Sequence, residues 1–209
     1  MKGKGLLIAL LLLLTAGCGG GRTAVTREYY MLDYAPPALG EMPCLEEILK
    51  VERFSVVQLF NSNALVRGTD SVTLSTFPDG RWKANPADLV TDSLVRDFRR
   101  AGLFRAVFSY RDPETCRFVL EGSVTEFLEV REEGSRKALL GLDVTLLDLN
   151  RPEISRRVVF QKSYSHGAPG GEEGPRGLAS GLSRSLAQLS GQIIKDVYQA
   201  VQAQDQRGE

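Results

Sequence analysis

The sequence has few of the residues from which catalytic and metal sites are commonly built. Among its 209 residues there are one histidine, three cysteines and one tryptophan. The single histidine, His166, excludes a histidine-based zinc cluster or a two-histidine iron site within one chain. Because His166 follows a strand-like segment and precedes a glycine-rich one, we expect it on the surface.

Motifs for nucleophiles and phosphates are missing as well. No serine stands in a Gly-x-Ser-x-Gly nucleophile elbow. The glycines between residues 167 and 177 match neither a dinucleotide fingerprint nor a P-loop. The acidic pairs Glu132-Glu133 and Glu172-Glu173 fall in predicted loops, where carboxylates are solvated rather than poised for acid–base work. We therefore expect a protein that is not an enzyme and that carries no cofactor or metal.

An excess of positive charge is also absent. The chain has 26 basic and 26 acidic side chains and a formal net charge of +0. Nucleic acids and anionic membranes are bound by clustered positive charge, so we expect no nucleic-acid partner. Four arginines close together are interpreted as the solvated face of a helix and its exit: Arg96, Arg99, Arg100 and Arg105.

The one long apolar stretch, residues 5–14, is shorter than the about 20 residues that cross a bilayer. With a short basic start before it and Ala16-Gly17-Cys18 after it, the stretch is typical of a secretory signal. The cysteine after two small residues makes it resemble a bacterial lipoprotein signal, which implies that residues 1–17 are removed and Cys18 is lipidated. An ordinary secretory signal, leaving Cys18 as a spare thiol, is the alternative. Residues 18–27 then form a flexible tether.

Two further cysteines, Cys44 and Cys116, follow the signal. Disulfides persist where exported proteins reside, so this pair could bridge the N-terminal arm to a central strand. Two separate buried thiols are the alternative, because the sequence does not place the two Cα atoms within bonding distance.

Periodicity predicts both helices and strands. Asn85 and Pro86 suit the N-cap and first position of a helix, Asp88 could complete a capping box, and Gly102 would end the helix. A second helix is predicted over residues 175–202 from a long apolar stripe. Strands are expected at 28–34, 49–57, 64–67, 72–77, 103–110, 116–125, 137–149 and 157–166. Residues 35–43 are expected to form a loop or extended arm, and 167–177 a glycine-rich, mobile loop.

The expected fold class is α+β. Alternation in the last three strands, with a bulge near Glu126-Phe127, predicts an antiparallel three-strand meander within an antiparallel or mixed sheet. Two amphipathic helices pack on one face of that sheet. We expect a single domain over residues 28–203 and a polar tail at 204–209.

A series of short blocks makes the chain resemble the ABC-type transport auxiliary lipoprotein component family, the PqiC-like lipoproteins. After the signal, the blocks are Tyr29-Tyr30-Met31-Leu32, Val51-Glu52-Arg53-Phe54, Ala64-Leu65-Val66-Arg67, Arg81-Trp82, Asn85-Pro86-Ala87-Asp88-Leu89-Val90 and Gly102-Leu103-Phe104-Arg105-Ala106-Val107. Residues 75–80 depart from the tyrosine-rich strand that the family often has before the Arg-Trp pair.

This resemblance implies a non-catalytic accessory subunit of a system that pairs an ABC transporter with an MCE-domain protein and moves lipid or other hydrophobic cargo across the envelope. The implied partners are the MCE-domain protein, the transporter subunits and a membrane, and a homo-oligomer is implied by analogy with MCE rings. Gly19 after the lipidated cysteine favours the outer membrane. Two alternatives stay open: an outer-membrane assembly or plug lipoprotein without a transporter partner, and a periplasmic hydrolase.

Trp82 is the remaining candidate site residue. Tryptophan is enriched among interface hot spots, which makes Trp82 a candidate interface anchor. Large aromatic side chains beside a helix N-terminus also commonly pack inward, so the alternative is a core residue that seats the helix beginning at Pro86.

Overall fold

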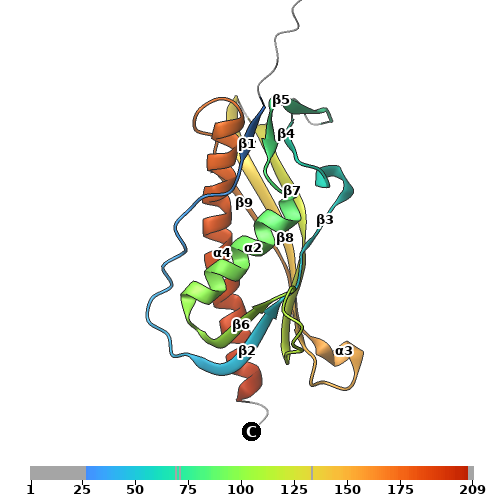
Figure 1. The fold of residues 1–209 in the computed structure, drawn as a ribbon, viewed down its shortest axis with the longest axis vertical. Coiled ribbons are helices and arrows are strands. Elements are labelled where there is room, and N and C mark those ends of the chain that lie inside the picture. The colour runs from blue at the N-terminus through green and yellow to red at the C-terminus, as the bar shows by residue number, and fades with distance from the viewer. Residues whose placement is uncertain (1–26, 69, 71, 133, 207–209) are drawn as a thin grey trace, which may run out of the picture.

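The computed structural model describes residues 27–206 except 69, 71 and 133. The predictions for the signal, for Cys18 and for most of the tether lie outside the described residues. Within the described part, a curled mixed sheet is packed against helices (Figure 1). Its strands are β1 (Glu28–Tyr30), β2 (Leu45–Val51), β3 (Ser55–Val56), β4 (Ala64–Gly68), β5 (Leu74–Trp82), β6 (Phe104–Ser109), β7 (Phe118–Glu132), β8 (Ser135–Asp148) and β9 (Val158–Pro169). The helices are α2 (Pro86–Ala101), α3 (Ile154–Arg157) and α4 (Pro175–Asp205), with a 3₁₀ turn at Gln58–Phe60.

The predicted meander is confirmed. β7, β8 and β9 pair antiparallel in chain order, and the register of β7 shifts between Val124 and Glu126, where the bulge was expected. Alternate residues of β8 are fully buried, as the period-two pattern predicts: Ala138, Leu140, Leu142, Val144 and Leu146.

The other edge of β7 is built differently. β2, β3 and β4 lie one after another along it, each parallel to β7. β6 then pairs with β2, while β5 and β1 extend the sheet from β4, so the sheet forks into two arms. The prediction of one strand over 49–57 was wrong, because the chain turns Phe54 into the core between β2 and β3. Gly122 on β7 makes this possible, since a Cβ there would lie 2.6 Å from the Phe54 ring.

Several boundaries also differ from those predicted. The first strand stops at Tyr30, and β9 runs on to Pro169. The strand expected at 72–77 continues through Pro78 to Trp82, and its register with β4 shifts along the way. α4 extends to Asp205, and the single turn of α3 was not anticipated.

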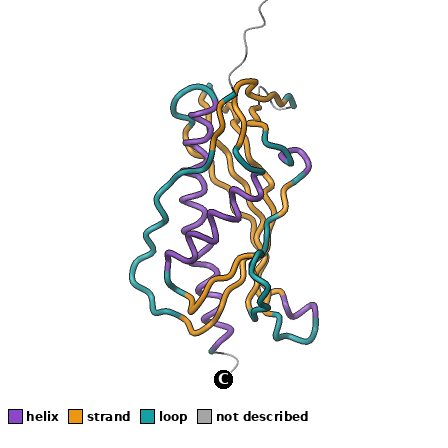
Figure 2. Tube along the Cα trace, in the orientation of Figure 1, coloured by secondary structure: helices purple, strands orange, loops and turns teal. Residues whose placement is uncertain are grey.

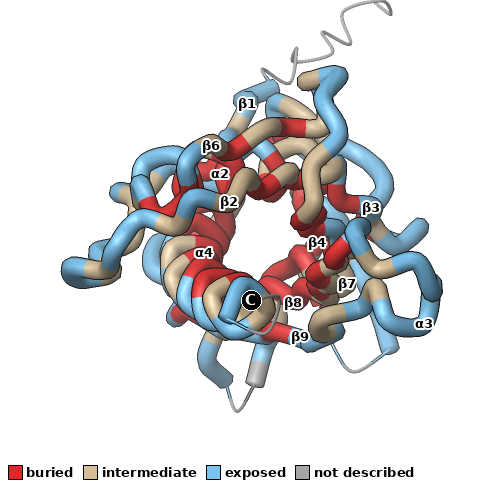
Figure 3. The backbone as a smooth tube through the Cα atoms, turned by 90° about the horizontal axis from the view of Figure 1, so that it is seen from below, coloured by how far each residue is buried: buried red, intermediate tan, exposed pale blue. Residues whose placement is uncertain are grey.

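Both long helices lie on one face of the curled sheet, as predicted, and the buried stretches of the helices and strands surround a common interior (Figure 3). The Asn85 carboxamide oxygen accepts a hydrogen bond from the Ala87 N–H at 2.9 Å, and Gly102 adopts φ +64°, which confirms both ends of α2. The apolar stripe of α4 is at most 1% exposed and comprises Leu178, Leu182, Leu186, Leu189, Ile193, Val197 and Val201.

Candidate docking surface

An extended arm, residues 31–44, joins β1 to β2 along the outside of the helices (Figure 2). It follows α4 downward: the Asp33 N–H donates to Ser183 Oγ at 3.0 Å, and the Tyr198 hydroxyl donates to the Pro43 carbonyl at 2.9 Å. The loop or arm expected at 35–43 is confirmed. These contacts fasten the arm to the long helix at both of its ends.

A buried carboxylate locks the middle of the arm to both helices. Asp97 of α2 is 1% exposed and accepts hydrogen bonds from the Tyr34 hydroxyl at 2.6 Å and from Ser190 Oγ of α4 at 2.7 Å. Arg96 Nε donates to the same carboxylate at 2.9 Å, and its guanidinium stacks 4.4 Å from the centre of the Tyr34 ring. Burial, and then the charge of Asp97, raise the pKa of Tyr34 well above its usual range. We call Tyr34, Arg96, Asp97 and Ser190 the arm lock.

Exposed apolar side chains flank grooves where the arm begins. Tyr29 is 63% exposed and Met31 is 65% exposed. A groove of about 630 Å³ separates them from Arg176 and the first turns of α4. A smaller, more apolar groove of about 260 Å³ lies on the other side of Met31, against Leu89 of α2. β1 is the last strand on its arm of the sheet, so its outer edge faces these grooves.

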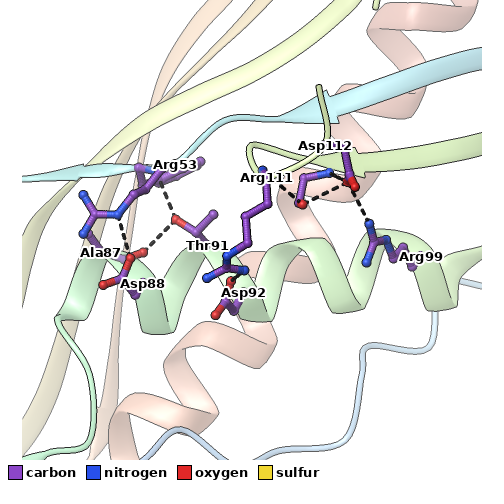
Figure 4. Close-up of polar contacts among 10 residues, drawn as sticks. Arg53, Ala87, Asp88, Thr91, Asp92, Arg99, Arg111 and Asp112 are labelled. Atoms are coloured by element: carbon purple, nitrogen blue, oxygen red, sulfur yellow. Dashed lines mark hydrogen bonds and ion pairs between the residues drawn. The ribbon is translucent and has the colours of Figure 1, made fainter. Parts of the chain in front are cut away.

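Ion pairs and hydrogen bonds fix α2 to the fork of the sheet (Figure 4). At the N-terminal end of α2, Asp88 forms an ion pair at 2.6 Å with Arg53, which lies in the linker between β2 and β3. Thr91 Oγ1 accepts the Phe54 N–H at 3.0 Å, which satisfies the backbone where β2 and β3 separate. Two further ion pairs also hold α2 in place: Arg111 with Asp92 at 2.9 Å, and Arg99 with Asp112 at 3.3 Å.

The run of arginines near the end of α2 is largely neutralised by these contacts. Arg96 and Arg99 are paired as described, and Arg105 lies 3.7 Å from Glu46. For Arg99, Arg100 and Arg105, which are exposed, the structure agrees with the interpretation as a solvated helix face and exit, whereas Arg96 is half-buried and belongs to the arm lock.

Trp82 is fully buried at the end of β5. Its ring meets that of Phe127 edge-on, with centroids 5.0 Å apart at 62°. The position agrees with the core alternative for Trp82 and offers no surface for an interface anchor.

Cys44 and Cys116 are both free thiols, the first exposed and the second half-buried. Burial raises the pKa of the Cys116 thiol, which disfavours its thiolate form.

His166 is half-buried rather than on the surface, because β9 continues past it. Its Nδ1 lies 3.2 Å from Ser185 Oγ of α4. That hydroxyl is fully buried, donates to the Ala138 carbonyl at 3.1 Å and accepts the Ala168 N–H at 3.2 Å. It joins α4 to β8 and β9 and is not accessible to a substrate.

Residues 27–206, apart from 69, 71 and 133, also contain neither of two features that would suggest a metal site or a membrane span. No group of three or more His, Cys, Asp or Glu residues there is arranged to hold a metal ion. No helix in the same part of the chain is both long and apolar enough to cross a membrane.

Comparison with known proteins supports the resemblance seen in the sequence. The model of the ABC-type transport auxiliary lipoprotein component family matches residues 30–194. No curated protein matches the sequence.

Two solved structures show the same fold at low sequence identity. A protein from Xanthomonas campestris, assigned to the family model DUF330, superposes with a TM-score of 0.77 at 18% identity, covering 86% of this chain and 99% of that one. A hypothetical protein from Chlamydia trachomatis superposes with a TM-score of 0.56 at 10% identity, covering 76% of this chain and 99% of that one. With the family model matching most of its length, the chain belongs to the ABC-type transport auxiliary lipoprotein component family.

Proposed function

We propose that this chain is a membrane-anchored, non-catalytic subunit of a transport system that pairs an ABC transporter with an MCE-domain protein. In this role it binds the MCE-domain protein and helps lipid or other hydrophobic cargo to cross the envelope. The observation that carries the proposal is the family match over residues 30–194. The fold agrees with a binding role, because its interior is filled by side chains and its described polar clusters serve to join segments.

The proposed anchor is a lipid on Cys18, at the periplasmic side of the outer membrane. Nine residues separate Cys18 from Glu28, where the folded part begins. More than one acyl chain is needed for stable anchoring, which a multiply acylated lipoprotein cysteine would supply. The arm lock would then attach the anchor to the domain, because a force on the tether is transmitted to α2 and α4 through the hydrogen bonds that Tyr34 and α4 make with Asp97.

Co-purification from detergent extracts tests the partnership. We expect the MCE-domain protein and the transporter subunits of the same system to co-purify with the full-length lipoprotein. Recovery of outer-membrane assembly proteins without any transporter or MCE subunit would contradict the proposal and favour the assembly or plug alternative.

Fractionation of a cysteine variant tests the anchor. Cys18→Ala should move the protein from the membrane fraction to the soluble periplasm, while Cys44→Ala, which removes an exposed cysteine within the folded domain, should leave it on the membrane. Cys18→Ala protein that stays on membranes after a salt wash would show that the anchor lies elsewhere.

A further inference from the structure

Two large, exposed side chains lie directly after the point where the chain enters the fold. Tyr29 and Met31 both line the groove of about 630 Å³ described above, and more than half of each side chain is exposed. The Lys83 ammonium lies 5.2 Å from the centre of the Tyr29 ring. Tyrosine is enriched at membrane–water interfaces, and lysine can bury its apolar stem there while its charge stays in water. This group therefore has the chemistry of an interfacial contact.

Hydrogen bonds on both sides of Met31 hold the segment in place. The Lys83 N–H donates to the Tyr30 carbonyl at 2.8 Å, which continues the pairing of β1 with β5. Two residues after Met31, the Asp33 N–H donates to Ser183 Oγ at 3.0 Å. Because the backbone is already fixed, a contact made by Tyr29 and Met31 loses little conformational entropy.

The charges around the groove are mixed. Arg27 precedes β1 and Arg176 lies at the start of α4, and both side chains are exposed. In the part of the chain that the structure describes, neither these two arginines nor Lys83 forms an ion pair with a carboxylate. Glu28 and Asp33 also line the groove, so the positive excess is small. Burial of apolar groups must therefore contribute more to a contact here than attraction to anionic lipids does.

The turn between β4 and β5 adds exposed apolar side chains at the same end of the molecule. Val72 is 90% exposed and Leu74 is 40% exposed. Asp70 Oδ1 accepts the Val72 N–H at 2.9 Å and the Thr73 N–H at 2.7 Å, which fixes the backbone beside Val72. β1, the start of α4 and the ends of β4 and β5 that this turn joins all lie at the upper end of the molecule (Figure 1). A flat surface contacts such separate groups at once, without requiring that they touch one another.

The length of the chain before β1 indicates which surface this end meets. The nine residues between Cys18 and Glu28 span at most about 35 Å when fully extended. α4 runs from this end to the opposite one and is about 46 Å long, which exceeds the reach of the tether. A lipid on Cys18 would therefore keep the β1 end close to the membrane. Once the anchor holds the protein there, a contact too weak to recruit it from solution is sufficient to orient it.

We propose that Tyr29, Met31 and Val72 rest on the surface of the membrane that holds the lipid on Cys18. Their apolar parts lie among the lipid headgroups and the upper acyl chains, and Lys83 lies beside the lipid phosphates. This inference rests on the proposed anchor and adds the face of the domain that meets the lipid. In this orientation the turn between β8 and β9 points away from the membrane (Figure 1).

Fluorescence of the labelled full-length lipoprotein in vesicles tests the contact. The acylated protein is reconstituted in vesicles of phosphatidylethanolamine and phosphatidylglycerol, with Cys44→Ser and Cys116→Ser so that an introduced cysteine is the single free thiol. An environment-sensitive fluorophore on Met31→Cys should emit at shorter wavelength in vesicles than in detergent-free buffer. Lipids that carry a spin label on the upper acyl chain should quench it. A label on Val72→Cys should behave in the same way.

Ile154→Cys is the matched control for the labelled positions. Ile154 is 79% exposed and lies on α3, at the opposite end of the molecule. Its label should stay unquenched in the same vesicles. Each of the three introduced cysteines should leave the melting temperature of the cysteine-substituted parent unchanged, because it replaces an exposed side chain.

Flotation of the vesicles separates failure of this inference from failure of the proposed anchor. If the protein floats with the vesicles but the label at position 31 is quenched no more than the label at position 154, the inference alone is overturned. A shorter emission wavelength at position 31 without quenching by spin-labelled lipid would show that protein, such as a second copy of this chain, covers this face, and would also overturn the inference. Full-length protein that fails to float would overturn the proposed anchor, and this inference with it.

Discussion

Removing the carboxylate of Asp97 should destabilise the domain strongly, because Asp97 joins three segments inside the structure. Asp97→Ala leaves the Tyr34 and Ser190 hydroxyls and the Arg96 guanidinium without their shared acceptor. Breaking a buried charge pair costs about 3–5 kcal/mol. The Arg96 side chain is 30% exposed and is partly solvated by water, so we expect the lower end, about 3 kcal/mol.

Thermal and urea unfolding followed by circular dichroism measure this cost. For a domain of this size, about 3 kcal/mol corresponds to a fall in Tm of roughly 6–12 °C. The matched control is Asp92→Ala on the same helix, whose ion pair with Arg111 is exposed and should contribute little to stability because solvent screens it. Equal losses in Asp97→Ala and Asp92→Ala would refute the reasoning.

A double-mutant cycle checks that the cost comes from the arm. Tyr34→Phe removes one charge-assisted hydrogen bond and should cost about 1.5–3 kcal/mol. In the Asp97→Ala background the same change should cost much less, because the acceptor is already gone. Full additivity of the two substitutions would show that Tyr34 and Asp97 do not stabilise each other.

Three further predictions concern other buried positions. Burial raises the pKa of Glu129, so the folded state favours the protonated carboxyl, and the stability this contributes is lost as pH rises through the folded pKa. Glu129→Gln should therefore be more stable than wild type in urea unfolding at pH 7.5, and the difference should vanish near pH 4. Burial and a hydrogen bond to an aspartate of α4 raise the pKa of Tyr164, so wild-type stability should fall above pH 10 by up to about 1.4 kcal/mol more per pH unit than in Tyr164→Phe. Gly122→Ala places a Cβ 2.6 Å from the Phe54 ring and should cost about 1–3 kcal/mol, while Gly167→Ala, with its nearest neighbour at 3.6 Å, should be tolerated; equal melting temperatures would contradict the close packing.

Local signals in the sequence were sufficient for the meander and for α2. Strict alternation through residues 137–149 fixes which side chains of β8 face the core, and short turns bring the next strands beside it. Asn85, Pro86 and Gly102 determine the ends of α2 because capping depends only on residues near each end.

Non-local features escaped prediction for a physical reason. β2, β3 and β4 are short, lack alternation and pair with residues of β7 that lie more than sixty positions later in the sequence, so no local pattern specifies their parallel register. Asp97 is one acidic residue beside Arg96 on an amphipathic helix, and its role depends on Tyr34 and Ser190 arriving from distant segments.

The two ends of the molecule are connected by α4, and this bears on how the protein could work. The helix is hydrogen-bonded to the arm at Ser183 and Tyr198 and to α2 at Ser190. It also meets the turn between β8 and β9 at Gln204, which accepts from Arg151 at 3.2 Å. Its 31 residues span about 46 Å. A continuous helix fastened at several points resists bending more than separate loops would, because each fastened turn must break its packing before it moves. The domain would therefore act as a stiff spacer that keeps the β8–β9 turn at a set distance from the end where β1 begins.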